Sequence, residues 1–166
     1  MNIFITGSSG FIGFHLVKKL LDKGHRIHGY DSMNGYYDIR LKKARLQILK
    51  GYKKFSFSRG LLENQKILSK SILKFKPKII IHLAAQAGVR YSIEKPRVYL
   101  DSNIIGTYNI IELAKKINVK HLLIASSSSV YGANKKLPFR ETDKTETQLS
   151  IYAATKKSTE CIAHSF

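Results

Sequence analysis

The sequence predicts an α/β fold in which helices cover a parallel β-sheet. Short apolar runs alternate along the 166 residues with longer segments whose apolar residues recur at spacings of three and four. Alternation of this kind is typical of βαβ units, whose strands lie parallel in one sheet. A glycine-rich turn between the first apolar run and the first helical segment points to the same architecture.

Five apolar runs are the expected strands: "NIFIT" (2–6), "RIHGYD" (26–31), "KFSF" (54–57), "KIIIHLAA" (78–85) and "HLLIASS" (121–127). The fourth run is almost unbroken in apolar character, which suits a strand buried on both faces. Helices are expected between the strands, at 11–24, 39–51, 64–75 and 96–117. Gly24 and Gly51 end two of them, as glycines at helix C-termini do. A loop over 134–149 then leads into a final helix.

Length and composition favour one domain over residues 1–166, with 43% hydrophobic and 24% charged residues. No apolar run is long enough to span a membrane, and the N-terminus offers no room for a signal peptide. Cys161 is the only cysteine, so an internal disulfide is excluded and a cytoplasmic location is expected. We expect no metal site.

The net charge of +18 raises the alternative of a nucleic-acid or membrane-surface binder. The basic residues are spread in pairs along the chain, and no arginine-rich arm or basic stretch with interleaved aromatics is present. This pattern favours a lysine-rich surface on an ordinary enzyme, with no nucleic-acid or membrane partner. A positive field would also attract an anionic substrate such as a nucleotide diphosphate.

The turn "ITGSSGFIG" places Gly7, Gly10 and Gly13 between the first strand and the first helix. Gly7 permits the tight turn, Gly10 lets the backbone approach a pyrophosphate, and Gly13 lets the helix pack on the strand. The helix N-terminus then offers free N–H groups to phosphates. Asp31 follows 18 residues after Gly13, at the end of the second strand. An acid there bonds the adenosine ribose and repels a 2′-phosphate, which favours NAD over NADP.

Several further motifs resemble one family. The glycine spacing, "HLAAQAG", "SSSSVYG" and "YAATK" are similar to the extended short-chain dehydrogenases/reductases. More narrowly, "GYYDIRLKKARL", "HLAAQAGVRYSIEKP", "DSNIIGTYNIIELA" and "LSIYAATKKSTE" resemble the NAD-dependent nucleotide-sugar epimerases and dehydratases, and among them UDP-glucuronate 4-epimerases. The resemblance covers the whole chain.

The resemblance implies a Rossmann-type, doubly wound parallel sheet that binds NAD. It also implies that the chain is truncated before the last strand or strands, and that the C-terminal domain that holds the UDP-sugar is absent. The expected activity is epimerisation of UDP-glucuronate to UDP-galacturonate by transient oxidation at C4, impaired in a chain of this length. A homodimer through the long fourth helix and the last helix is implied as well.

Tyr152 and Lys156 are four residues apart, which places them on one face of the final helix. The resemblance makes Tyr152 the general base for the sugar hydroxyl. A tyrosine phenol is largely protonated at neutral pH, and Lys156 with the cationic nicotinamide would favour its phenolate form. Lys156 would also hydrogen-bond the nicotinamide ribose. Ser127 lies 25 residues before Tyr152 and would orient or relay the proton.

The remaining site residues also follow from the resemblance. Arg90, Ser128 and Ser129 would hold the diphosphate, the sugar or its carboxylate. Besides Tyr152 and Lys156, the expected cofactor-binding residues are Gly7, Gly10, Phe11, Ile12, Gly13, Asp31, Leu62, Leu83, Ala84, Ala85 and Asn103. Leu61 replaces an Asp that meets the adenine in the family, so NAD affinity is expected to be lower by up to about tenfold.

Two alternatives stay open beside this interpretation. UDP-glucose 4-epimerases share the Ser, Tyr and Lys. A chain that binds NAD without turning over a substrate is also consistent with the sequence. The related 4,6-dehydratases are disfavoured, because they carry an Asp–Glu pair where this chain has Ser128 and Ser129.

Overall fold

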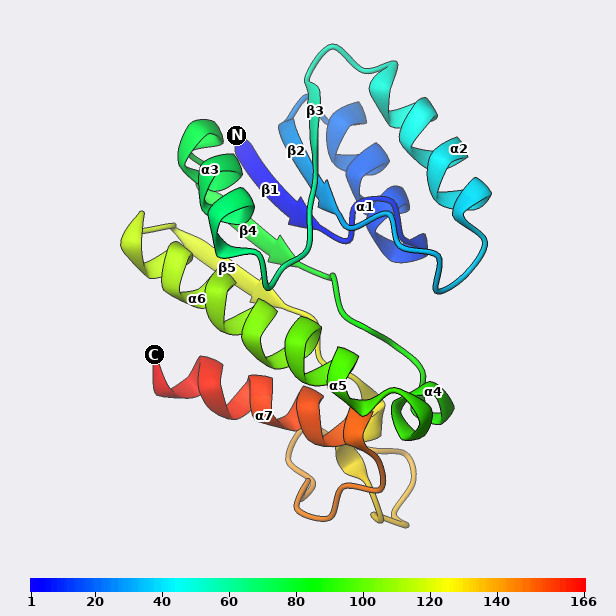
Figure 1. The fold of residues 1–166 in the computed structure, drawn as a ribbon. Helices are drawn as coiled ribbons and strands as arrows, with labels where there is room; N and C mark the ends of the chain where they lie inside the picture. Colours follow the sequence, from blue (N-terminus) through cyan, green and yellow to red (C-terminus); the bar gives the residue numbers. More distant parts are fainter. The chain divides into compact units, whose positions relative to one another are not determined.

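The computed structural model describes residues 1–166, which form two compact units. The first unit combines Met1–Ala84 with Asn109–Ala125, and the second combines Ala85–Tyr108 with Ser126–Phe166 (Figure 1). The expectation of one cofactor-binding domain over 1–166 stays a prediction.

The first unit contains a five-stranded parallel sheet in the order β3-β2-β1-β4-β5. Its strands are β1 (Asn2–Thr6), β2 (Arg26–Asp31), β3 (Phe55–Arg59), β4 (Ile79–His82) and β5 (His121–Ile124). All five predicted strands are present, and the last two end earlier than the apolar runs suggested. Strand order reverses between β1 and β4, and ligands of open α/β sheets bind beyond the carboxyl ends at such a point.

Helices cover both faces of this sheet: α1 (Phe11–Asp22), α2 (Ile39–Lys50), α3 (Gln65–Phe75) and α6 (Gly106–Lys116). Alternate residues of the strands face opposite sides. Ile3, Ile5 and Ile27 pack with Val17 and Leu21 of α1 and Leu49 of α2. On the other side, Phe4, Tyr30 and Ile80 pack with apolar residues of α3 and α6. The predicted doubly wound, Rossmann-type sheet is therefore confirmed.

The turn between β1 and α1 is held by backbone packing that excludes a side chain at two glycines. Gly7 has a φ of +71°, and a Cβ on it would lie 2.9 Å from the backbone nitrogen of Ala84. A Cβ on Gly13 would lie 2.0 Å from the carbonyl oxygen of Gly7. The two glycines thus bring the start of α1, the end of β1 and the end of β4 together.

The second unit is mainly helical: α4 (Val89–Glu94), α5 (Pro96–Tyr99), η1 (Leu100–Ile105), η2 (Ser128–Tyr131) and α7 (Ile151–Ser165). The helix predicted over 96–117 is a run of α5, η1 and α6, in which η1 is a π-helix. Within this unit α7 packs against η1, η2, α4 and α5. The segment predicted as a loop, 134–149, contains no helix or strand.

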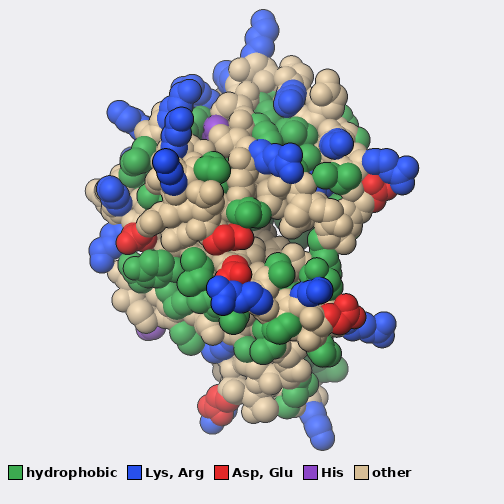
Figure 2. Space-filling view, viewed as in Figure 1, with side chains coloured by type: hydrophobic (Ala, Val, Ile, Leu, Met, Phe, Trp, Pro, Cys, Tyr) green, Lys and Arg blue, Asp and Glu red, His purple; other side chains and the backbone are tan.

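Lysine and arginine side chains are scattered over the face of the molecule shown in Figure 2, and acidic side chains are few. This distribution agrees with the spread of basic pairs along the sequence and with the net charge of +18. No helix in the structure combines the length and the apolar character that crossing a bilayer requires.

A buried histidine lies within the apolar packing of the first unit. His28 of β2 stacks on Phe4 with ring centroids 5.2 Å apart. Its Nδ1 lies 2.8 Å from Ser56 Oγ, and its Nε2 lies 2.9 Å from Ser58 Oγ. Burial, with a smaller contribution from the Lys74 charge, lowers the pKa of His28 to about 4. The neutral imidazole is therefore the form that the folded chain holds at neutral pH.

Substituting Gly13→Ala is expected to destabilise the first unit by about 1–3 kcal/mol, because the new Cβ overlaps the Gly7 carbonyl and the turn must move. Gly35→Ala is the matched control, since a Cβ at Gly35 meets nothing within 4 Å. Urea unfolding followed by circular dichroism measures both free energies. Equal free energies of unfolding for the two variants would contradict the close packing of Gly13 on Gly7.

The buried His28 is expected to make stability depend on pH. Its folded-state pKa of about 4 lies below the ordinary value of 6.5, so the unfolded chain takes up the proton first as pH falls. The contribution of His28 to the free energy of unfolding is complete above about pH 6.5. As pH falls towards 4 this contribution is lost progressively, by up to about 3 kcal/mol. His28→Gln should remove this part of the pH dependence of unfolding, whereas His164→Gln, on an exposed residue, should keep it. An unchanged slope in His28→Gln would refute the assignment.

Candidate cofactor and catalytic site

The N-terminus of α1 leaves backbone N–H groups available to a ligand. Gly10 is the N-cap, and no side chain caps the helix. Phe14 donates its N–H to the Gly10 carbonyl at 3.0 Å, while the first-turn residues Phe11, Ile12 and Gly13 precede the first such bond. Phe11 and Ile12 are each 67% exposed. Uncapped N–H groups and the helix dipole at this end suit a phosphate.

Asp31 lies beside this turn, at the end of β2. Its Oδ2 accepts the N–H of Ser9 at 3.1 Å, and its Oδ1 accepts the N–H of Met33 at 2.9 Å. The residue is 5% exposed. The structure therefore joins two predicted features, the glycine turn and the acid, through a direct hydrogen bond.

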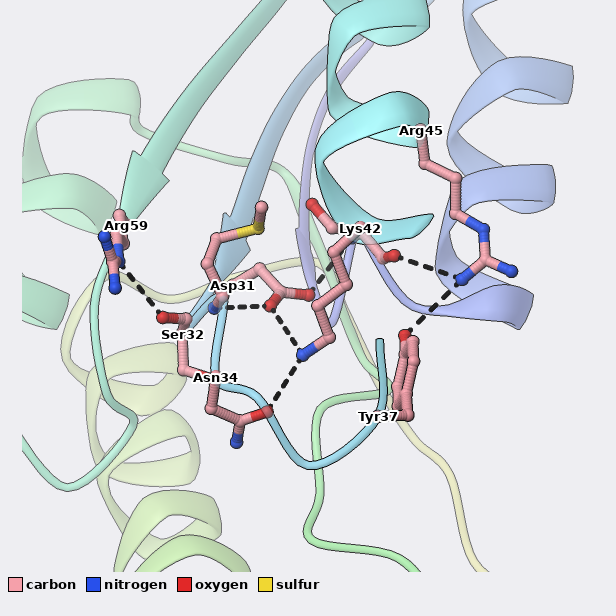
Figure 3. A network of polar contacts seen from close by, with 9 residues as sticks. Asp31, Ser32, Asn34, Tyr37, Lys42, Arg45 and Arg59 are labelled. Atoms are coloured by element: carbon pink, nitrogen blue, oxygen red, sulfur yellow. Dashed lines mark hydrogen bonds and ion pairs between the residues drawn. The ribbon is translucent and has the colours of Figure 1, made fainter. Parts of the chain in front are cut away.

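Lys42 of α2 forms an ion pair with Asp31 that sequence reasoning missed. Its Nζ lies 3.4 Å from Asp31 Oδ1 and donates to Asn34 Oδ1 at 3.1 Å (Figure 3). Lys42 is 6% exposed, and its ammonium lies 5.0 Å from the ring centroid of Tyr37. A signal was present in the sequence, because Lys42 stands seven residues before the buried Leu49, on the apolar stripe of the predicted helix.

The end of β4 is fixed to the end of β1 by side-chain hydrogen bonds. Thr6 Oγ1 lies 2.7 Å from His82 Nδ1 and accepts the Ala84 N–H at 3.1 Å. Leu83 and Ala84 are partly buried here. Sequence reasoning left His82 out of the site, and its position agrees with a structural role.

Leu61 and Leu62 follow β3 and differ in exposure. Leu62 is 6% exposed, and its carbonyl accepts from Asn109 Nδ2 at 3.0 Å. Leu61 is 50% exposed, and its carbonyl accepts from the Tyr30 hydroxyl at 3.0 Å. Leu61 therefore offers a backbone anchor and an apolar surface at this position.

Asn103 is the buried centre of the second unit. Its Oδ1 accepts the Gln86 N–H at 2.7 Å, and its Nδ2 donates to the Gln86 carbonyl at 3.1 Å and to Thr155 Oγ1 at 3.0 Å. The residue stands in η1, and π-helical turns are frequent at functional sites. Asn103 thereby links the segment that begins at Ala85 to α7. Its predicted contact with the cofactor stays a prediction.

Ser127 ends the segment after β5 and caps η2. Its Oγ accepts the Ser129 N–H at 3.2 Å. Ser128 is exposed and Ser129 is partly buried. The Ser127 hydroxyl proton is not used in this capping bond, so the hydroxyl keeps the capacity to donate. Arg90 lies in α4 and is exposed.

Tyr152 and Lys156 lie one turn apart on α7, as the spacing predicted. Ser150 caps this helix by accepting the Ala153 N–H at 3.1 Å, which fixes where the helix begins. Tyr152 is partly buried, and its ring makes an edge contact with Tyr99 at a centroid distance of 6.1 Å. Lys156 is 6% exposed, and burial lowers the pKa of its ammonium, an effect that the Glu160 carboxylate partly opposes.

The predicted residues are thus divided between the two units. The first unit holds the glycine turn, Asp31, Leu62, Leu83 and Ala84, which fit the phosphates and the adenosine ribose of a dinucleotide. The second holds Ala85, Arg90, Asn103, Ser127, Ser128, Ser129, Tyr152 and Lys156. In each unit the described hydrogen bonds fix the backbone around these residues.

Known proteins match this chain over its whole length. A protein of Rhizobium meliloti named "Probable UDP-glucuronate 4-epimerase" is 50% identical over 166 residues, which are 100% of this chain and 49% of that protein. "Protein CapI" of Staphylococcus aureus is 52% identical, with the same coverage. The chain spans about half the length of the curated relatives it matches.

Solved structures match with similar coverage. The UDP-glucuronic acid 4-epimerase of Bacillus cereus, in complex with UDP-glucuronic acid and NAD, matches with a TM-score of 0.91 and 34% identity over 99% of this chain and 52% of that chain. The UDP-glucose 4-epimerase of Bifidobacterium longum, with NAD+ and UDP, gives 0.87 and 28% over 99% and 48%. The family described as GDP-mannose 4,6 dehydratase matches residues 4–166. Since this match covers nearly every residue, the chain belongs to the GDP-mannose 4,6 dehydratase family.

Proposed function

We propose that this chain serves an NAD-dependent nucleotide-sugar 4-epimerase that interconverts UDP-glucuronate and UDP-galacturonate by transient oxidation at C4. The observation that carries the proposal is the buried Lys156 one helical turn after Tyr152 on α7. A buried ammonium is poorly screened by water, so it acts strongly on a neighbouring phenol. The similarity to epimerases of known structure that bind NAD and a UDP-sugar supports the same function.

The candidate site residues each have a definite part in this proposal. Tyr152, as phenolate, takes the proton from the sugar hydroxyl, and Ser127 orients that hydroxyl or relays the proton. Lys156 stabilises the phenolate and holds the nicotinamide ribose. Asp31 holds the adenosine ribose, and the α1 N-terminus holds the pyrophosphate. NAD, when bound, supplies the hydride acceptor that lets C4 be oxidised and then reduced on its other face.

Epimerisation is favoured over dehydration, although the family carries the name of a dehydratase. Elimination of water needs an acid and a base beside the sugar, for which the dehydratases use an Asp–Glu pair. This chain presents Ser128 and Ser129 in that stretch, and serine hydroxyls do not replace a carboxylate pair. The two serines, with Arg90, are instead suited to hold a sugar or its carboxylate.

UDP-glucose is the second candidate substrate, since solved structures of a UDP-glucose 4-epimerase and of a UDP-glucuronic acid 4-epimerase both match this chain. A carboxylate at C6 needs a cation or several hydrogen-bond donors, whereas a hydroxymethyl group does not. Arg90, which is exposed on α4, and the serines of η2 favour the glucuronate.

We also propose that the chain forms a homodimer and lies in the cytoplasm. Val98, Leu100, Ile105 and Tyr108 are large apolar side chains exposed along the α5–η1–α6 run. Exposed apolar residues in such a group are typical of interaction surfaces. Light scattering of the purified chain would give its mass, and a monomer at all concentrations would contradict the dimer.

The chain is expected to bind NAD by itself, because the phosphate and ribose residues lie within one unit. Isothermal titration measures this binding. Turnover of UDP-glucuronate is measured for the chain alone and for the chain expressed with any coding sequence that follows it. Binding without turnover in both forms would favour a non-catalytic NAD-binding protein. Absence of NAD binding, together with a salt-sensitive shift of DNA or RNA, would favour the nucleic-acid alternative.

In the form that turns over UDP-glucuronate, Tyr152→Phe is expected to lower kcat by about 10²–10⁴-fold, because the general base is removed. Its Kd for NAD should rise by no more than about tenfold, because at most one hydrogen bond to the cofactor is lost and the ring keeps its contact with Tyr99. Tyr36→Phe, which removes a hydroxyl from an exposed tyrosine, is the matched control and should retain turnover. Full activity of Tyr152→Phe would exclude it as the base.

A further inference from the structure

A groove on the first unit lies where α3 leaves part of the sheet uncovered. α3 packs against β1, whereas β2 and β3 continue beyond it to the edge of the sheet (Figure 1). The groove between α3 and these two strands has a volume of about 670 Å³. Sites for small organic ligands typically have volumes of roughly 300–1,000 Å³. None of the residues that line the groove belongs to the candidate cofactor and catalytic site.

Five cations line this groove, and no acidic residue does. They are three lysines of α3 and the arginines at the start of β2 and the end of β3: Lys66, Lys70, Lys74, Arg26 and Arg59. The lysines recur every four residues, so they lie on one face of the helix. All five residues are exposed, and none of them forms an ion pair with a carboxylate. Their positive charges are therefore available to an anion.

The groove also offers a hydrogen-bond donor and apolar surface. His28 lies between two hydroxyls, with Nδ1 2.8 Å from Ser56 Oγ and Nε2 2.9 Å from Ser58 Oγ. Because its pKa of about 4 keeps His28 neutral at pH 7, the imidazole donates to one serine and accepts from the other. The serine that accepts keeps its own hydroxyl proton for a further acceptor. The Phe75 ring centroid lies 5.3 Å from that of His28, and Ile67 is 41% exposed, so both add apolar surface to the groove.

We propose that the groove between α3 and β3 is a second ligand site, which binds an organic phosphate about the size of a mononucleotide. Ammonium and guanidinium groups are the side chains that bind phosphate oxygens. The phosphate groups of the ligand lie along the lysines of α3, and its ring lies on Ile67 and Phe75. This site is separate from the α1 turn, and the proposal does not depend on the proposed binding of NAD.

A general effect of the +18 charge makes a different prediction. An anion that is attracted only by the overall field loses the same affinity whichever two surface lysines are removed. Lys19 and Lys23 match Lys66 and Lys70, because both pairs are exposed and four residues apart. Lys19 belongs to α1 and Lys23 directly follows it, and α1 packs on the opposite face of the sheet from α3. The two pairs therefore separate a groove from a field.

The experiment titrates the isotope-labelled whole chain with ATP and, separately, with inorganic tripolyphosphate at physiological ionic strength. Amide NMR signals of Ser56, Ser58 and Ser71 report the groove, whereas those of Gly10 and Phe11 report the α1 turn, where a nucleotide also fits. The Kd of the groove is taken from its own signals. ATP should shift the groove signals and bind there about threefold or more tightly than tripolyphosphate, because its ring covers apolar surface. Groove signals that ATP does not shift would overturn the proposal.

Three variants at exposed residues complete the test, and circular dichroism checks that each is folded. Lys66→Gln/Lys70→Gln should raise the Kd of the groove for ATP by about tenfold or more. The charge-matched control Lys19→Gln/Lys23→Gln should change this Kd by less than about twofold. Ile67→Ala should raise the Kd for ATP by about threefold and leave that for tripolyphosphate unchanged. Equal effects of the two lysine pairs, or a single-stranded oligonucleotide that binds the groove more tightly than ATP, would also overturn the proposal.

Discussion

The close approach of three backbone segments at the reversal of strand order is the constraint on which the first unit depends. Gly7, Gly13 and the Ala84 amide lie so near one another that a single Cβ on either glycine would overlap backbone atoms. Thr6 adds two side-chain bonds to the end of β4, one with His82 and one with the Ala84 amide. This packing sets where α1 begins and directs its free N–H groups. It also places Ser9 where its amide reaches Asp31, so the proposed phosphate and ribose subsites share one support.

The strands and most helices could be predicted because each is encoded locally. The apolar runs of β1 and β2 have the predicted bounds, and Asp38, Asn64 and Ser150 cap helices that begin close to where the periodicity indicates. The π-helical stretch was not predictable, because one widened turn shifts the apolar spacing by only about one residue. The end of β4 was overestimated, since "LAA" continues the apolar run but leaves the sheet to meet Thr6.

The sequence names candidate site residues, whose roles stay predictions, but says little about what surrounds them. Motif spacing singles out Asp31, Tyr152 and Lys156 as candidates, but no linear pattern states that Lys42 pairs with Asp31 from 11 residues away. Asn103 shows the same limit, because its bonds to Gln86 and Thr155 join residues far apart in the chain. Sequence reveals residue types that suit a chemistry, whereas the partners that tune them arise from packing.

Lys42 and Lys156 are the two lysines that the fold buries, one in each unit. The many other lysines face water and make up most of the +18 charge. The chain therefore carries two populations of amines that differ in solvent access. Amine-acylating reagents would neutralise the outer population first, and the two inner ammonium groups would react only when a unit opens. The reaction rate of Lys42 would thus report local opening around Asp31, and that of Lys156 would report local opening around Tyr152. Both rates would stand out from those of the freely reactive surface amines.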